Sequence, residues 1–474
     1  MPSLSDNNVM GRVRHIHFVG VGGAGMSGIA EVLHNLGYEV SGSDLKDSAV
    51  TRHLKGLGVK VTAGHDAALI NGSDVIVMSS AVSADNPEVV AARRQRIPVI
   101  PRAEMLAELM RFRQGIAIAG THGKTTTTSL IASVLAEGGL DPTYVIGGQL
   151  NSSKSNARLG SGRYLVAEAD ESDASFLHLQ PVMAVLTNID VDHLETYHGD
   201  YRSLQEKFIE FLQHLPFYGL AVLCVDDDGI RDIMPRLSKP FITYGIHEKA
   251  DYKATYIHHS ERASTFTVSG PGGDEPLQVR LNMPGDHNVQ NALAAIIVAK
   301  QLDVPDLAIT RALAGFQGIA RRCDILGSVV MDGKQVLIID DYAHHPREIE
   351  ATLEAVRAGW PGRRVIVIFQ PHRYTRTRDL FEDFCSVLSE LEVLFMLEVY
   401  PAGEKPVTGA DSRSLCRALR LRGKVEPVFV KDRNDIAAML PPVVGDGDIV
   451  LILGAGDIGS LGPELMGQYS GSMH

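Results

Sequence analysis

The stretch A-G-T-H-G-K-T-T-T-T (Ala119–Thr128) decides the fold of the central part of this chain. The apolar run Ile116–Ala119 leads into it and predicts a buried strand, and the apolar spacing over 129–136 predicts a helix after it. Two glycines, a lysine and a row of hydroxyls lie between the two elements. This order predicts a phosphate-binding loop, because the free N–H groups and the dipole of a helix N-terminus attract anions.

The lysine and the first threonine of this loop carry the predicted chemistry. Lys124 can reach the terminal phosphates of a nucleotide, and the hydroxyl of Thr125 can bind Mg²⁺. The spacing G-x-x-G-K-T from Gly120 is shorter than the usual G-x-x-x-x-G-K-[ST]. An ordinary strand-to-helix turn is the alternative interpretation, but Gly-Lys-Thr at this junction favours the phosphate loop.

The composition limits the classes of function. A chain of 474 residues, 45% of them apolar, has room for about three domains with packed cores. A net charge of −12 argues against a nucleic acid as the main partner. The four cysteines lie far apart, which favours a reducing compartment over disulfides or a zinc site. Without a signal-peptide core or an apolar run long enough to span a bilayer, we expect a cytoplasmic protein that does not bind membranes.

Strand and helix patterns alternate in three sets, which predicts an α/β fold of three domains. The first, residues 1–114, begins with the strand His15–Val19 and is expected to be Rossmann-like. The second, residues 115–326, contains the phosphate loop and is expected to be P-loop ATPase-like, with a parallel sheet plus a small antiparallel sheet built from hairpins over 250–281. The third, residues 327–474, is again expected to be Rossmann-like.

Two motifs of the form G-x-G-x-x-G follow predicted strands. The first, Gly20–Gly25, precedes a helix, and Asp44 follows the next strand, where an acid would bind a ribose. This pattern alone favours a nicotinamide cofactor, but a nucleotide sugar diphosphate can rest on the same amides, and a turn without a ligand is a third interpretation. The second motif, Gly454–Gly459, has no acid at the right distance, and we favour a turn without a ligand there.

Acidic side chains follow two predicted strands of the central set. The run E-A-D-E-S-D (Glu168–Asp173) follows the strand Tyr164–Ala167, and Asn188, Asp190, Asp192 and His193 follow the strand Val182–Leu186. Strand ends beside a phosphate loop are where Mg²⁺ ligands are expected. Glu168 should lie nearest the sheet edge because it ends its strand directly. A solvated acidic loop is the alternative interpretation.

Two further polar clusters follow strands of the third set. One comes after Val365–Phe369 and consists of His372, Arg373, Arg376 and Arg378. The other follows a neighbouring strand and consists of Asp340, Asp341, Tyr342, His344 and His345. A basic cluster in an acidic chain suits a carboxylate or phosphate ligand, and open α/β sheets bind ligands at the carboxyl ends of strands. A solvated loop remains the alternative for any one of these residues.

Taken together, the motifs resemble those of the Mur ligases over nearly the whole chain, and most closely the branch that adds alanine. They stand in the family's order: Gly20–Ala30, Gly120–Thr128, Glu168–Asp173, Thr187–His193, Gly285–Ala292, Asp340–Pro346 and Phe369–Thr377. The resemblance implies ATP-dependent ligation of L-alanine to the carboxylate of UDP-N-acetylmuramate, through an acyl phosphate, in peptidoglycan precursor synthesis. It also implies ATP and Mg²⁺ (or Mn²⁺) as cofactors, and a monomer or homodimer.

The resemblance further implies which residues hold each ligand. The UDP sugar would be held by Gly22, Gly23, Ala24, Gly25, Met26, Ser43, Asp44, His65, Ser79, Ser80 and Arg102. ATP would be held by Gly120, Thr121, His122, Gly123, Lys124, Thr125, Thr126, Asn291, Arg322 and Asp340. Metal ions would be bound by Thr125, Glu168 and His193, and the amino acid by His344, His372, Arg373 and Arg376. The implied catalytic residues are Lys124, His193 and His344, with His344 or His345 positioning or deprotonating the amine.

Three other functions stay open at this point. A ligase of the same family that adds a whole peptide would share the ATP loop, although Ser172–Leu177 and Phe369–Thr377 favour a single amino acid. A nicotinamide-dependent oxidoreductase would leave Lys124 and the acidic cluster unexplained. A non-enzymatic nucleotide switch predicts ATP turnover that does not depend on an amino acid. Several Mur ligases carry a carbamylated lysine, and Lys207 lies near its expected place, but the spacing does not fit and we do not assign it.

Overall fold

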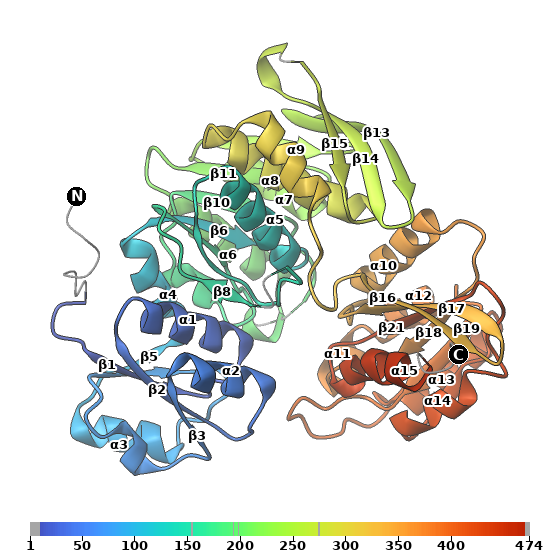
Figure 1. Ribbon diagram of the computed structural model, residues 1–474, viewed down its shortest axis with the longest axis horizontal. Helices are drawn as coiled ribbons and strands as arrows, with labels where there is room; N and C mark the ends of the chain where they lie inside the picture. Colours follow the sequence, from blue (N-terminus) through green and yellow to red (C-terminus); the bar gives the residue numbers. More distant parts are fainter. Residues whose placement is uncertain (1–9, 153–154, 193, 198, 274, 470–474) are drawn as a thin grey trace. The chain divides into compact units, whose positions relative to one another are not determined.

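Three β-sheets organise the chain (Figure 1). The structure, a computed structural model, describes residues 10–152, 155–192, 194–197, 199–273 and 275–469. His193, which the resemblance implies as a metal ligand and catalytic residue, lies outside this described part. The sheets have five, ten and six strands in the order of the chain, and helices alternate with the strands. The predicted α/β fold of three domains is thereby confirmed.

The chain divides into two compact units, each described by itself below. Unit 1 comprises residues 1–256, 266–280 and 288–316, and unit 2 comprises residues 257–265, 281–287 and 317–474. Unit 1 holds the five-stranded sheet and most of the ten-stranded sheet, and unit 2 holds the six-stranded sheet.

The N-terminal sheet, drawn in blue in Figure 1, is parallel and has the order β3-β2-β1-β4-β5. Its strands are β1 (His15–Val19), β2 (Glu39–Asp44), β3 (Lys60–Ala63), β4 (Val75–Met78) and β5 (Val99–Pro101). Its helices are α1 (Ala24–Asn35), α2 (Ala49–Leu57), α3 (Pro87–Gln95) and α4 (Arg102–Arg111). The strand order reverses between β1 and β4, and such a switch point is where open parallel sheets bind ligands.

The central sheet has the order β15-β14-β13-β12-β11-β10-β6-β9-β7-β8. Its strands are β6 (Gln114–Ala119), β7 (Thr143–Val145), β8 (Ala157–Arg158), β9 (Tyr164–Glu168), β10 (Met183–Leu186), β11 (Leu220–Cys224), β12 (Phe241–Gly245), β13 (Tyr252–Ser260), β14 (Ala263–Ser269) and β15 (Leu277–Leu281). Its helices are α5 (Lys124–Glu137), α6 (Tyr201–Gln213), α7 (Asp228–Ile233), α8 (Asp286–Gln301) and α9 (Asp306–Ala314). Strand β6 pairs in parallel with both β9 and β10, so the phosphate loop and the two acidic strand ends lie at one edge of this sheet.

The third sheet has the order β16-β17-β21-β18-β19-β20, and only its edge pair β16–β17 is antiparallel. Its strands are β16 (Asp324–Met331), β17 (Lys334–Asp341), β18 (Val365–Phe369), β19 (Val393–Leu397), β20 (Val428–Val430) and β21 (Ile449–Leu453). Its helices are α10 (Pro346–Gly359), α11 (Tyr374–Asp379), α12 (Phe381–Leu388), α13 (Ser412–Arg422), α14 (Ile436–Met439) and α15 (Leu461–Tyr469). Strands β17, β18, β19 and β21 contribute to two separate apolar clusters, because side chains alternate between the two faces of a strand.

Within the described ranges, no helix is both long and apolar enough to cross a membrane. All four cysteines are free thiols, and Cys224, Cys385 and Cys416 are buried.

Candidate nucleotide and amino-acid sites

The predicted phosphate loop joins β6 to α5, and its two glycines are required by close contacts. Gly120 has φ +126° and Gly123 has φ +80°, where only glycine is unstrained. A Cβ at Gly120 would collide with the Thr187 hydroxyl and lie 2.9 Å from the carbonyl oxygen of Asn188. A Cβ at Gly123 would lie 2.7 Å from Oδ1 of Asn291. Glycine at these two positions therefore lets the loop pack closely against Thr187, Asn188 and Asn291.

Lys124 is held inside this loop by four oxygen atoms. Its Nζ donates to the carbonyl oxygens of Gly120 (2.6 Å) and Thr121 (3.1 Å) and to both carboxylate oxygens of Glu171 (2.8 Å each). Burial alone would lower the pKa of Lys124, but the carboxylates of Glu171, Asp170 and Glu168 outweigh it and raise this pKa above its ordinary value. The ammonium therefore stays charged at the position where phosphate oxygens are expected.

The segment after β10 supports the loop from the other side. Asn188 Oδ1 accepts from the His122 backbone N–H at 2.8 Å, and the Thr187 hydroxyl donates to the His122 carbonyl oxygen at 2.6 Å. The His122 ring lies 3.0 Å from a carboxylate oxygen of Asp190. Asn291, on α8, accepts from the Thr127 hydroxyl at 3.0 Å. These residues fix the loop's shape, and Thr126 lies buried in the first turn of α5.

Two of the predicted metal ligands lie at the same sheet edge. Thr125 is in the first turn of α5, and Glu168 ends β9, opposite Ile118 in the register with β6. The backbone N–H of Gly147 donates to Oε1 of Glu168 at 2.6 Å and orients that carboxylate. A hydroxyl and a carboxylate are oxygen ligands that suit a hard cation such as Mg²⁺, so these residues fit the metal that the sequence predicts.

Arg102 connects the first glycine motif to this acidic edge. Its Nη2 donates to Oδ2 of Asp170 at 3.2 Å. Its guanidinium also packs against the glycine motif, since a Cβ at Gly25 would come within 3.0 Å of Nη1. Lys124 and Arg102 both lower the pKa of Asp170, against the opposing effect of burial. A predicted UDP-sugar residue thus contacts the acidic segment that begins at the predicted metal ligand Glu168.

The first glycine motif lies at the switch point of the N-terminal sheet. The backbone N–H of Gly22 donates to Oδ2 of Asp44 at 2.8 Å, and Gly20 packs against Ser79. Gly23 precedes the first turn of α1, which contains Ala24, Gly25 and the buried Met26. Ser80 is exposed next to Ser79. The predicted UDP-sugar residues that follow β1 and β4, together with those on β2 and α1, are thereby brought to one end of this sheet.

A buried carboxylate, Glu88, organises the remaining predicted residues of this domain. It is fully buried and lies 2.8 Å from Nδ1 of His65, 2.9 Å from the Ser43 hydroxyl and 2.6 Å from Nε2 of His17. Burial opposes its ionisation, but the hydrogen bonds from His17, Ser43 and His65 outweigh burial and lower the pKa of Glu88. The contact through Nδ1 leaves Nε2 of His65 as the ring nitrogen that can meet a ligand.

In unit 2, three of the four predicted amino-acid-binding residues gather around His372. The His372 ring stacks on Tyr400 with centroids 5.5 Å apart and meets the His344 ring edge-on at 5.6 Å. Arg376 Nη1 donates to the His372 carbonyl oxygen at 3.4 Å. Arg373, the fourth, lies at the start of α11, where its Nε pairs with Glu404 at 3.1 Å. A guanidinium and two imidazoles therefore line one site.

Both histidines of this cluster are neutral at physiological pH. Burial, with Arg376 as a further cause, lowers the pKa of His344 to about 3 and that of His372 to about 4. A neutral imidazole can accept a hydrogen bond from an amine, whereas a protonated one would repel an ammonium group. His345 instead caps α10, where its Nδ1 accepts from the Arg347 backbone N–H at 3.4 Å.

The low pKa of His344 predicts a pH-dependent stability of unit 2. In the unfolded chain this pKa is about 6.5, so between about pH 6.5 and 3 the folded state binds fewer protons than the unfolded chain. Its contribution to stability is full above about pH 6.5 and is lost as pH falls. The free energy of unfolding, measured by chemical unfolding at pH 7 and at pH 5, should fall between these two values in the wild type. In His344→Gln this fall should be smaller by on the order of 2 kcal/mol.

The exposed His258 on β13 provides the control for this measurement, since His258→Gln should leave the pH dependence as it is. Burial raises the pKa of Asp340 and of Asp341 to about 6, so these two groups stabilise the folded state as pH falls, opposite to His344. Both are present in every variant, so the difference between variants reports on His344 alone. If the free energy of unfolding changed with pH equally in the wild type and in His344→Gln, a depressed pKa at His344 would be contradicted.

Asp340 and Arg322, which were predicted to hold the nucleotide, lie at the end of β17 and just before β16. Oδ2 of Asp340 accepts from Nε of Arg321 at 3.1 Å, and its buried Oδ1 has no hydrogen-bond partner among the described residues. The Arg322 guanidinium lies over the Tyr342 ring at 5.2 Å and 3.9 Å from Glu348. Asn291, predicted for the same ligand, belongs to unit 1.

The second glycine motif is filled by side chains. Arg321 donates to the Gly454 carbonyl oxygen and packs against Gly459, while Gln370 packs against Gly456. The motif thus surrounds protein groups, as the interpretation without a ligand predicts. Lys207, on α6, pairs with Glu210 at 2.7 Å and is half-exposed.

Some residues of these sites were not assigned from the sequence. Glu171 was one acid among four in its run, and Tyr400 and Glu88 carried no motif. Each follows or faces a strand end, but their distances from Lys124, His372 and His65 depend on the packing of segments far apart in the sequence. For Glu88, the sequence offers one indication of a buried role: a charged residue directly before the apolar pair Val89 and Val90 of α3.

Family models match the chain over most of its length. The Mur ligase family catalytic domain matches residues 15–114, the Mur ligase middle domain residues 118–299, and the Mur ligase glutamate ligase domain residues 321–456.

Three solved structures are similar over 65% to 97% of this chain. The UDP-N-acetylmuramate–alanine ligase of Thermotoga maritima is 29% identical, with a TM-score of 0.82 over 97% of this chain and 100% of its own. The UDP-N-acetylmuramate:L-alanyl-γ-D-glutamyl-meso-diaminopimelate ligase of Neisseria meningitidis is 30% identical, with a TM-score of 0.59 over 65% of this chain and 100% of its own. A murein peptide ligase of Psychrobacter arcticus shares the fold, at 24% identity and a TM-score of 0.70 over 96% of this chain and 98% of its own. The chain therefore belongs to the Mur ligase family of acid–amino-acid ligases.

Proposed function

We propose that this protein joins L-alanine to the carboxylate of UDP-N-acetylmuramate, using ATP, through an acyl phosphate. The observation that carries the proposal is the position of Arg102, which contacts both the glycine motif and Asp170 beside Lys124. A sugar nucleotide on the glycine motif would thereby present its acid next to a triphosphate in the phosphate loop.

In this proposal each domain has its own ligand. Residues 1–114 bind the UDP sugar, residues 115–326 bind ATP, and residues 327–474 receive the amino acid and close over the site. The Thermotoga alanine ligase supports a single amino acid as acceptor, because its TM-score of 0.82 is higher than the 0.70 of the Psychrobacter peptide ligase at nearly equal coverage of this chain.

The first step is the attack of the sugar's carboxylate on the γ-phosphate of ATP, which breaks the bond to the β-phosphate, forms the acyl phosphate and releases ADP. Two unit charges about 4 Å apart repel each other by about 4 kcal/mol at an effective dielectric constant near 20, so the two anions need local cations. Lys124, released from Glu171, would contact the transferring phosphate, and Arg102 would hold the sugar nucleotide. Mg²⁺ or Mn²⁺, held by Thr125 and Glu168, with His193 as a further ligand, would neutralise charge on the phosphate oxygens.

The second step is the attack of the alanine amine on the acyl phosphate, with release of phosphate. Arg376 would bind the alanine carboxylate, since a guanidinium matches a carboxylate in geometry and charge. The neutral His344 and His372 would accept hydrogen bonds from the amine and aim its lone pair. With a pKa of about 3, His344 is a weak base, which supports positioning rather than full deprotonation as its role.

The test is phosphate release from ATP with UDP-N-acetylmuramate and a panel of acceptors. L-alanine should give the highest kcat/KM, with glycine and L-serine lower and the tripeptide L-alanyl-γ-D-glutamyl-meso-diaminopimelate inactive. Turnover with the tripeptide alone would establish the peptide-adding alternative. Phosphate release that is independent of any acceptor would support a nucleotide switch instead.

The Glu88 network allows a sharper test of the sugar-nucleotide site. Glu88→Gln keeps the size of the side chain but removes the charge that orients His65, so KM for UDP-N-acetylmuramate should rise about tenfold, with KM for ATP unchanged. Glu39→Gln on the same sheet is the matched control, because its carboxylate is exposed and pairs with Lys60 at 2.8 Å. Equal KM values for both variants would show that Glu88 has only a structural role.

A further inference from the structure

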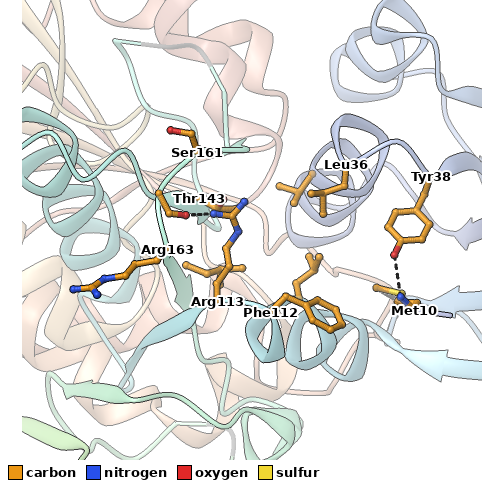
Figure 2. A pocket seen from close by; sticks show the side chains of 12 residues that line it. Met10, Leu36, Tyr38, Phe112, Arg113, Thr143, Ser161 and Arg163 are labelled. Carbon is orange, nitrogen blue, oxygen red and sulfur yellow. Dashed lines mark hydrogen bonds between the residues drawn. The ribbon is translucent and has the colours of Figure 1, made fainter. Parts of the chain in front are cut away.

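A cavity of about 400 Å³ lies within unit 1 at the connection between the first and the central sheet. Phe112 and Arg113, which join α4 to β6, both line it. One wall comes from α1 and the residues after it, and the other from the end of α4 and the edge of the central sheet (Figure 2). A volume of this size is typical of a site for a small organic molecule.

Most of the cavity wall is apolar. Val32, Leu109 and Leu165 are each at most 3% exposed, and Leu36 completes this surface. Phe112 also lines the cavity although 41% of its surface is exposed. An exposed aromatic ring beside buried aliphatic side chains is a surface that an apolar ligand would cover.

Arg113 places one cation in this apolar wall. Its guanidinium donates to the Gly162 carbonyl oxygen, and no carboxylate of the described residues lies within ion-pair distance. The nearby Asp141 is already occupied, since it pairs with Arg158 at 2.8 Å and accepts from the Ser161 hydroxyl at 2.7 Å. Burial lowers the pKa of Arg113, with Asp141 opposing, yet a guanidinium remains charged in proteins.

The second arginine of the wall is directed elsewhere. The guanidinium of Arg163 donates to the Tyr164 hydroxyl at 2.7 Å and lies over the Tyr164 ring at 5.0 Å. Figure 2 shows it pointing away from Arg113, whose own side chain reaches between Thr143 and Leu36. The cavity therefore combines an apolar surface with a single guanidinium that lacks an anionic partner.

We propose that this cavity binds a small amphipathic monocarboxylate. Its apolar chain would pack on Val32, Leu36 and Leu109, and its carboxylate would accept hydrogen bonds from Arg113. A carboxylate matches the planar guanidinium and supplies the charge that the site lacks. A neutral ligand of equal size would leave that charge uncompensated.

The same cavity is connected to the proposed UDP-sugar site by two helices. Helix α1 begins directly after the first glycine motif and brings Val32 to the cavity, and α4 begins at Arg102 and ends at Arg111 beside Phe112. A ligand that packs between them would restrain both helices and tighten UDP-N-acetylmuramate binding severalfold. This coupling rests on the proposed function, whereas binding in the cavity does not.

Titration calorimetry with octanoate tests the binding directly. Octanoate should bind the wild type and Arg111→Met equally, because Arg111 is exposed and pairs with Glu108 at 2.9 Å outside the cavity. Arg113→Met should weaken octanoate binding at least about tenfold and leave the weaker binding of octanol unchanged. Absence of octanoate binding up to about 10 mM, or equal affinity in Arg113→Met, would overturn the proposal.

Leu36→Trp gives a second test that keeps Arg113 in place. The larger side chain fills the cavity, so both octanoate and octanol binding should be lost while the melting temperature stays near that of the wild type. Retained octanoate binding in this variant would place the ligand elsewhere. The affinity of the wild type for UDP-N-acetylmuramate, measured with and without octanoate, then tests the coupling. An unchanged affinity would contradict a regulatory role for the cavity, even if ligation activity is normal.

Discussion

Replacing Lys124 by alanine is expected to lower the kcat of ATP-dependent ligation by about a thousandfold or more. The ammonium lies within 3.1 Å of two carbonyl oxygens of the phosphate loop and is the group placed to meet the transferring phosphate. UDP-N-acetylmuramate should still bind with the affinity of the wild type, because its proposed residues lie on the first sheet. Phosphate release and calorimetric binding of the sugar nucleotide measure the two effects separately.

The control must account for the partner of Lys124. Glu171 is 2% exposed, and burial raises its pKa to about 7 even beside Lys124, so loss of the ammonium either leaves its negative charge buried without a cation or makes it take up a proton, and both outcomes destabilise the fold. The double variant Lys124→Ala/Glu171→Gln removes this charge and should recover the melting temperature without recovering turnover. Recovery of both would mean that Lys124 stabilises the fold and has no direct part in catalysis. Loss of sugar-nucleotide binding in the double variant would contradict the assignment of the two ligands to separate domains.

The fold could be predicted from the sequence because apolar runs end at polar clusters. The strands at His15–Val19, Val365–Phe369 and Ile449–Leu453 have the predicted bounds. The last two are buried on both faces, so their whole length is apolar. Helix α5 instead begins at Lys124, ahead of the apolar spacing that predicts a helix from residue 129, because its first turn consists of polar residues of the phosphate loop.

The arrangement of the sites was only partly predictable. Strand ends of a parallel sheet meet at one edge, so the proximity of Lys124 and Glu168 follows from the pattern of strands. The contact of Arg102 with Asp170 depends on how two sheets pack within unit 1, and no local pattern contains that information. The role of Glu171 as the partner of Lys124 likewise depends on the direction of one side chain among several acids.

Arg376→Ala is expected to raise KM for L-alanine by about a hundredfold and to leave KM for ATP and for the sugar nucleotide unchanged. Arg376 is 7% exposed, and hydrogen bonds between charged groups in such a site contribute about 1.5–3 kcal/mol each. Arg376 also helps to lower the pKa of His344 and of His372, after the larger effect of burial. Its removal should therefore raise both pKa values and shift the acidic limb of the pH–rate profile to higher pH.

Arg378→Ala is the matched control, because Arg378 lies on the same short helix but is exposed and pairs with Asp379 at 2.7 Å. It should leave every KM value as in the wild type. Arg376→Lys separates charge from geometry: a lysine restores one positive charge but not the planar pair of donors, so KM for L-alanine should recover only in part. A rise in KM for ATP instead of L-alanine would show that this guanidinium serves the nucleotide, and the third domain would then have to receive the amino acid through other residues.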